Sequence, residues 1–140
     1  MRGIFLAVLV AVTMTATPAP AATFVYVGNA ESNEVWVLAL DRQSGDLTVV
    51  EKVGIPGITK PGISTPMAVS PDRRILYVGT RGEPKIVAGF AIDPASGRLK
   101  HLASGPLPDS MAYISTDRTG RYLLGASYPG HKVKIGRAHV

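Results

Sequence analysis

The sequence has 140 residues, 46% of them hydrophobic and 18% charged, which is the composition of one globular domain and excludes a disordered chain. The formal net charge is +5, but the Lys and Arg residues are scattered and do not alternate with aromatic residues, so we expect no nucleic-acid partner. The sequence contains no cysteine, which excludes disulfides, thiol chemistry and cysteine-ligated zinc.

Residues 1–22 have the three parts of a secretory signal peptide. Arg2 is basic, an apolar run extends from Ile4 to Val12, and small residues surround Pro20. The apolar run of about nine residues is too short for a membrane-spanning helix, which needs about twenty. We therefore expect cleavage near Ala22, no stable membrane anchor afterwards, and export of a cysteine-free protein to the bacterial periplasm.

Short strands and repeated turns fill the rest of the chain. Four strands are predicted in the central part, at residues 67–69, 75–80, 86–92 and 99–103, because these segments are apolar, β-branched or aromatic. Turns separate them: Pro71 and Asp72 favour one turn, and Gly97 can adopt the positive φ of another. Antiparallel strands joined by such turns predict an all-β protein.

The same pattern recurs along the chain. The motif D-x-x-S-G-x-L begins at Asp41 and at Asp93, and S-P-D at Ser70 corresponds to S-T-D at Ser115. Four antiparallel strands in a repeat of about 45 to 50 residues form the blade of a β-propeller. Residues 23–134 would then supply the outer part of one blade, one complete blade and the inner half of a third. That is about two and a half blades of a ring that needs about four to eight.

Four stretches of the sequence carry a resemblance to a known family. They read YVGNAESNEVWVLALDRQSGDL, TPMAVSPDRRILYVGTRGE, IVAGFAIDPASGRL and ISTDRTGRYLLGASY. Together they resemble the N-terminal third of the seven-bladed lactonase propellers, the bacterial 6-phosphogluconolactonase family, from Thr23 to Lys134. The resemblance implies a seven-bladed ring that hydrolyses 6-phosphogluconolactone to 6-phosphogluconate in the pentose phosphate pathway. It also implies that the proton-transfer residues belong to later blades.

Two alternatives stay open. Phosphorylated sugars are scarce outside the cytoplasm, so an exported member could act on an unphosphorylated lactone. The segment Tyr26–Asn29 reads Y-V-G-N and is similar to the Y-V-T-N repeats of exported propellers regarded as surface or binding modules. Whether the protein is an enzyme is therefore left open by the sequence.

The connecting loops contain the candidate site residues. Lactone hydrolysis needs an activated water, a donor for the carbonyl oxygen and groups that hold the substrate. A guanidinium such as that of Arg81 can bind a phosphate or carboxylate through two hydrogen bonds, and a histidine can act as a general base near neutral pH. The candidate substrate-binding residues are Arg81, Glu83, Ser127 and Tyr128, and the candidate base is His131.

Each candidate also has a purely structural interpretation. Arg81 and Glu83 could form a solvated ion pair, Tyr128 could only begin a turn, and His131 could simply be exposed. The aspartates of the repeated motifs, Asp72, Asp93 and Asp117, are predicted to form turns. The sequence contains no zincin, serine-hydrolase or nucleotide-binding motif and no acidic cluster with calcium-ligand spacing, so we expect no metal and no cofactor.

The last six residues, IGRAHV at 135–140, continue neither the apolar alternation nor the turn pattern of a blade. They can be encoded by ATC GGA AGA GCA CAC GTC, which is the start of a common sequencing adapter. We therefore expect the natural sequence to depart from this one after Lys134, and we do not count His139 as a candidate base.

Overall fold

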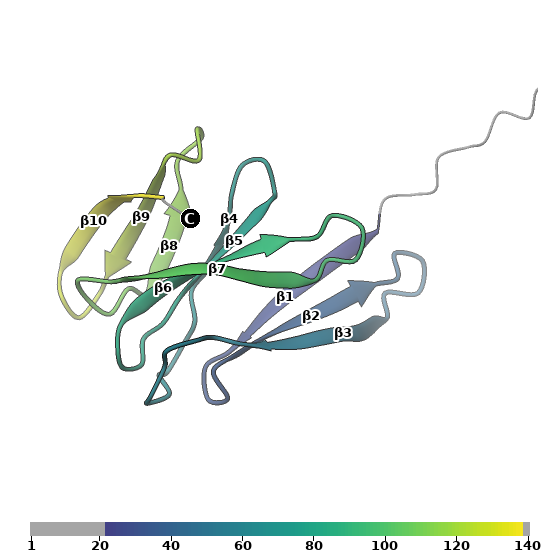
Figure 1. Ribbon diagram of the computed structural model, residues 1–140, viewed down its shortest axis with the longest axis horizontal. Helices are drawn as coiled ribbons and strands as arrows, with labels where there is room; N and C mark the ends of the chain where they lie inside the picture. Colours follow the sequence, from purple (N-terminus) through teal and green to yellow (C-terminus); the bar gives the residue numbers. More distant parts are fainter. Residues whose placement is uncertain (1–21, 139–140) are drawn as a thin grey trace, which may run out of the picture.

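The computed structural model of the protein describes residues 22–138, which form ten strands in three antiparallel sheets (Figure 1). Apart from Ala22, the predicted signal peptide lies outside the described residues, and so do residues 139–140. No helix long and apolar enough to span a membrane occurs between residues 22 and 138. The strands are β1 (Thr23–Asn29), β2 (Glu34–Leu40), β3 (Leu47–Gly54), β4 (Met67–Val69), β5 (Ile75–Gly79), β6 (Ile86–Ile92), β7 (Leu99–Pro106), β8 (Tyr113–Thr116), β9 (Tyr122–Ser127) and β10 (Lys132–Arg137).

The sheets follow one another as successive propeller blades, which confirms the all-β prediction. The central sheet has the order β4-β5-β6-β7 and is the complete four-stranded blade that the repeat predicted. The sheet β1-β2-β3 precedes it and the sheet β10-β9-β8 follows it, as Figure 1 shows. The short strands β4 and β8 lie side by side, and the Thr116 hydroxyl of β8 donates to the Val69 carbonyl of β4 at 3.2 Å. The second and third sheets therefore meet at their first strands.

Aspartate side chains form the repeated turns, as predicted. The carboxylate of Asp93 accepts the amides of Ala95 and Ser96 at 2.8 and 3.0 Å. These hydrogen bonds stabilise the ionised carboxylate and lower the pKa of Asp93. The equivalent Asp41 accepts two amides in the same way, and both turns end on a glycine with positive φ, 81° at Gly45 and 70° at Gly97. The D-x-x-S-G motif thus forms a turn in which the aspartate carboxylate accepts two backbone amides and the glycine has a positive φ.

Two apolar cores hold the three blades together. Successive side chains of a strand point to opposite faces, so Leu76 and Val78 of β5 face the first sheet while Tyr77 faces the third. In the first core they meet Val35 and Val37 of β2, which are fully buried. The residues of the second core are Tyr77, Met111 and Ile114. Burial on both faces of the central blade fixes its position between its neighbours.

The side chain of Trp36 lies outside these cores. It is half-buried, its indole N–H donates to the Glu34 carboxylate at 3.1 Å, and the Lys52 ammonium lies 3.7 Å from the centre of its ring. Val35 and Val37 on either side of it face the second sheet, so Trp36 is on the opposite face of β2. The alternating stretch Val35-Trp36-Val37-Leu38 predicts that Trp36 packs between blades. Within residues 22–138 it does not, because its side chain is on the face of β2 that points away from the second sheet.

Strand β10 extends past the expected boundary at Lys134. Ile135 pairs with Leu124, and the amide of Ala138 donates to the Arg121 carbonyl at 2.9 Å. All six residues of β10 are exposed, so residues 135–137 continue the strand without entering a core. The adapter origin of residues 135–140 stays a prediction.

Candidate functional site

Three connections between strands meet at one end of the sheets. They are residues 55–66 between β3 and β4, residues 80–85 between β5 and β6, and residues 107–112 between β7 and β8. The Lys60 amide donates to the Glu83 carbonyl at 3.1 Å, and the Glu83 amide donates back to the Lys60 carbonyl at 3.0 Å. The Arg81 amide donates to the Ser64 carbonyl at 3.3 Å. Backbone hydrogen bonds therefore join the first two connections over several residues.

Two glycines allow this close approach. A Cβ atom at Gly62 would overlap the backbone of Arg81 and Gly82, and a Cβ atom at Gly82 would overlap the Lys60 carbonyl. At the base of the same loop, the buried hydroxyl of Thr80 accepts the Ile86 amide at 3.1 Å. The loop that carries Arg81 is consequently fixed at both ends and along its side.

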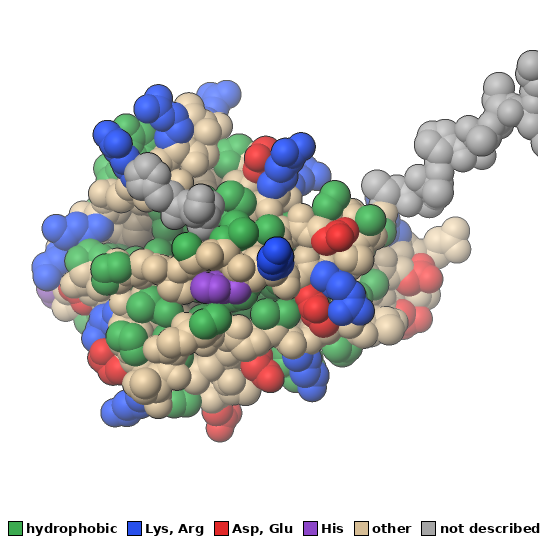
Figure 2. Space-filling model, in the orientation of Figure 1, with side chains coloured by type: hydrophobic (Ala, Val, Ile, Leu, Met, Phe, Trp, Pro, Cys, Tyr) green, Lys and Arg blue, Asp and Glu red, His purple; other side chains and the backbone are tan. Residues whose placement is uncertain are grey.

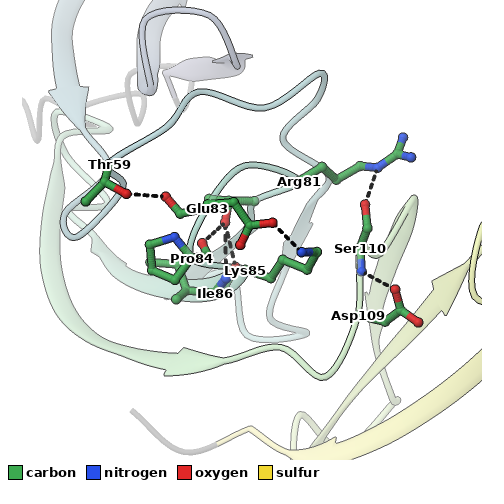
Figure 3. A network of polar contacts seen from close by, with 9 residues as sticks. Thr59, Arg81, Glu83, Pro84, Lys85, Ile86, Asp109 and Ser110 are labelled. Atoms are coloured by element: carbon green, nitrogen blue, oxygen red, sulfur yellow. Dashed lines mark hydrogen bonds and ion pairs between the residues drawn. The ribbon is translucent and has the colours of Figure 1, made fainter.

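The Arg81 side chain leaves this loop and reaches residues of the other two connections. Its Nε donates to the Ser110 hydroxyl at 3.0 Å, and its Nη1 donates to the Ser64 hydroxyl at 3.4 Å. Figure 3 shows the side chain extended toward Ser110, away from the Glu83 carboxylate. Serines that are 17 and 29 positions away in the sequence thus hold one guanidinium.

Asp109 continues the network toward the third blade. Its carboxylate accepts the Ser110 amide at 2.7 Å and forms an ion pair with the Lys132 ammonium of β10 at 3.3 Å (Figure 3 shows the first contact). The amide of Ser110, and then the ammonium of Lys132, lower the pKa of Asp109 by stabilising its ionised form. Asp109 is therefore an acceptor at neutral pH and is not suited to donate a proton.

No hydrogen bond or ion pair joins the other predicted site residues to the Arg81 side chain within residues 22–138. The Glu83 carboxylate pairs with the Lys85 ammonium at 2.5 Å, so the suggested ion pair with Arg81 does not form. Ser127 is buried, and its hydroxyl accepts the Gly130 amide at 3.1 Å, which closes the turn between β9 and β10. These two side chains already have intramolecular partners.

Tyr128 and His131 are the first and last residues of that turn. Tyr128 is 82% exposed, and its ring centre lies 6.5 Å from that of His131. His131 has a φ of 47° and is exposed, and no hydrogen bond or ion pair orients its imidazole within residues 22–138. The role of His131 as a general base stays a prediction without a neighbouring acid to support it.

Sequence reasoning missed four residues of the network: Ser64, Asp109, Ser110 and Lys132. A signal for two of them was present, because the repeat offset of 45 residues that aligns Ser70 with Ser115 also aligns Ser64 with Asp109. No group of three His, Asp or Glu side chains suited to a metal ion occurs in the described part of the chain. The arrangement offers hydrogen-bond donors and positive charge, and it can hold an anionic or polar ligand.

Comparisons with known proteins place this architecture in a family. The family model for the seven-bladed β-propeller lactonases matches residues 53–138. A 6-phosphogluconolactonase of Enterobacter sp. (strain 638) is 42% identical over 113 residues, which cover 81% of this chain and 32% of that protein. The chain thus spans about a third of the length of the curated relatives that it matches.

Solved structures agree on the fold. A structure from Bacteroides fragilis NCTC 9343 superposes with a TM-score of 0.73 at 23% identity, covering 81% of this chain and 31% of that one. A periplasmic gluconolactonase of Pseudomonas aeruginosa gives a TM-score of 0.70 at 24% identity, covering 80% and 31%. The repeated turns, the four-stranded central blade and the family match lead to one conclusion: the chain belongs to the seven-bladed β-propeller lactonase family.

Proposed function

We propose that the protein hydrolyses a sugar lactone, with 6-phosphogluconolactone as the first substrate to test. The observation that carries the proposal is the 42% identity over 113 residues to a relative named 6-phosphogluconolactonase. The geometry supports it, because an Arg held by two serines at the end where three connections meet offers donors for a phosphorylated sugar.

The reaction adds water to the lactone carbonyl carbon and breaks its bond to the ring oxygen, which gives the open acid. Residues 22–138 supply groups that bind and orient, namely the Arg81 guanidinium with Ser64 and Ser110. A base that activates water and an acid that protonates the ring oxygen are further requirements of the chemistry. We assign these two roles to parts of the propeller beyond the three blades described.

A second candidate substrate is an unphosphorylated sugar lactone. The signal-peptide pattern of residues 1–22 favours it, because an exported enzyme would meet few phosphorylated sugars. The same pattern supports our proposal that the protein is exported to the periplasm. Fractionation of the native host, with an antibody against the protein, tests the location: recovery in the cytoplasmic fraction alone would contradict it.

The activity test compares two lactones. The protein expressed from its complete reading frame is incubated with 6-phosphogluconolactone and with glucono-1,5-lactone, and ring opening is followed as acid release against the spontaneous reaction. Faster opening of the phosphorylated lactone supports the first substrate, and faster opening of glucono-1,5-lactone alone supports the second. If neither lactone opens faster than in the spontaneous reaction, the proposal that the protein is a lactonase is refuted. That result would favour a non-catalytic binding module, which is the alternative that the Tyr26–Asn29 motif suggests.

A further inference from the structure

We propose that the Arg81 guanidinium binds the anionic group of the ligand, and that Ser64 and Ser110 hold it in the binding orientation. The inference rests on the proposed function for the lactone itself, but it names a separate interaction. It assigns Arg81 to the phosphate at the far end of the sugar and not to the reacting carbonyl. The ligand class is a phosphorylated sugar acid or its lactone.

The charges around Arg81 lead to this assignment. Three ion pairs occur in residues 22–138, and none of them includes Arg81. Two acidic residues close to it in the sequence or in the network have other partners. Glu83, two residues along the chain, pairs with Lys85, and Asp109, whose carboxylate accepts the Ser110 amide, pairs with Lys132. The partners of the half-buried guanidinium within residues 22–138 are two neutral hydroxyls, so no carboxylate of this part of the chain pairs with it, and partial burial of an unpaired charge is unfavourable. An anion supplies the missing counter-charge.

The donors of Arg81 have the right number and arrangement. A guanidinium carries five N–H donors in one plane. Ser110 accepts from Nε and Ser64 accepts from Nη1, which leaves three N–H groups without a partner within residues 22–138. Planar donors of this kind bind phosphate through two parallel hydrogen bonds, which is stronger than a single contact.

The site is also held in place before a ligand arrives. The loop of Arg81 is joined to the β3–β4 connection by hydrogen bonds between Lys60 and Glu83. Ser110 is fixed in turn, because its amide donates to the Asp109 carboxylate at 2.7 Å. A side chain held from two sides loses little freedom on binding, so more of the interaction energy appears as affinity.

A binding experiment tests the assignment without reference to catalysis. Wild type, Arg81→Gln, Arg81→Lys and the control Arg118→Gln, an exposed residue of the β8–β9 turn, are titrated with 6-phosphogluconate by calorimetry. We expect a loss of affinity of about tenfold or more for Arg81→Gln, a smaller loss for Arg81→Lys and no change for the control. Equal affinity of Arg81→Gln and wild type, or no binding of 6-phosphogluconate to the wild type, would overturn the inference.

The role of the serines needs a double-mutant comparison. Ser110→Ala should weaken 6-phosphogluconate binding several-fold in the wild-type background, because Arg81 loses one of its two holding contacts. In the Arg81→Gln background the same change should have no effect, since the contact is already absent. An equal effect of Ser110→Ala in both backgrounds would show that Ser110 acts independently of Arg81.

Kinetics separate this inference from the proposed function. If the wild type accelerates lactone opening, Arg81→Gln should raise KM for 6-phosphogluconolactone by a larger factor than KM for glucono-1,5-lactone, and the control Arg118→Gln should change neither. Equal losses with both lactones would place Arg81 at the reacting carbonyl and refute the assignment. If the wild type accelerates neither lactone, the proposed function fails, and the 6-phosphogluconate titrations still decide whether Arg81 binds the anion.

Discussion

Replacing Gly97 by Ala tests how the first two blades pack together. Gly97 has a φ of 70°, and a Cβ atom there would overlap the ring of Phe24 in β1. The carbonyl of Gly97 also accepts the Tyr26 hydroxyl at 2.9 Å. The positive φ costs about 1 to 2 kcal/mol for an L-residue, and overpacking against the ring adds about 1 to 3 kcal/mol. We therefore expect Gly97→Ala to lower the free energy of unfolding by about 2 to 5 kcal/mol.

Gly45 provides a matched control from the same motif. Its φ is 81°, but no atom lies within 4 Å of the position that its Cβ would occupy. Gly45→Ala should therefore cost only the backbone term of about 1 to 2 kcal/mol. Urea unfolding of this chain, followed by the fluorescence of Trp36, the single tryptophan of the sequence, measures both variants.

A third variant identifies the source of the difference. In a Phe24→Ala background the space next to Gly97 is open, so Gly97→Ala should cost no more than Gly45→Ala. Equal losses for the two glycine variants in the wild-type background would refute the reasoning. An unchanged cost of Gly97→Ala after removal of the Phe24 ring would refute it as well.

Three further predictions concern the cores, the blade contacts and pH. Phe90→Ala should lower the free energy of unfolding by about 3 to 5 kcal/mol, because the Phe90 side chain is fully buried. Leu102 is exposed, so Leu102→Ala should change the free energy of unfolding by about 0.5 kcal/mol or less. Similar urea midpoints for the two variants would contradict the assignment of Phe90 to the core. Glu51→Gln should lower the free energy of unfolding by about 1 to 2 kcal/mol, because the Glu51 carboxylate accepts the Leu99 amide at 2.7 Å across the first two blades. Arg98→Gln should lower it less, because the ion pair of Arg98 with Glu51 involves an Arg98 side chain that is 57% exposed. The reverse order of the two losses in urea titrations would contradict this prediction. The pKa of Asp93 is lowered from its ordinary value of 3.8, so its contribution to stability is complete above pH 3.8 and is lost as the pH falls through the folded-state pKa. Asp93→Asn should therefore reduce the loss of stability that acid causes below pH 3.8. If stability falls with pH in the variant as it does in the wild type, the Asp93 turn contributes nothing to the acid sensitivity.

The turns and the central blade could be predicted because their signals are local. The repeated aspartates and glycines determine the turn geometry within five residues, and the apolar segments between them match β4, β5 and β6 closely. Strand β7 continues to Pro106, three residues past its predicted end at Ala103, because its exposed residues pair with β6 without apolar alternation. Local patterns therefore established the architecture and left strand ends less certain.

The site was predictable only in part. Arg81 could be selected from its residue type and its loop, but its partners could not, because Ser64 and Ser110 come from connections to other strands. Glu83 was paired with the wrong neighbour: Arg81 and Lys85 are both two residues away in the sequence, and the carboxylate pairs with Lys85. Side chains of serine and aspartate in loops carry no periodicity that marks them as partners of a distant arginine.

The strands pair with neighbours in the sequence, whereas the contacts of Arg81 join residues far apart in it, and this difference affects how the protein loses its binding capacity. Every strand pairs with a neighbour in the sequence, so each sheet can form from hairpins. The contacts of Arg81 form only when the connections before β4 and after β7 have come together with its loop, and they involve partly exposed groups. Contacts of this kind belong to the regions that open with the least free energy. Mild denaturation should therefore release the anion-binding end while amide protons of the central blade are still protected from exchange.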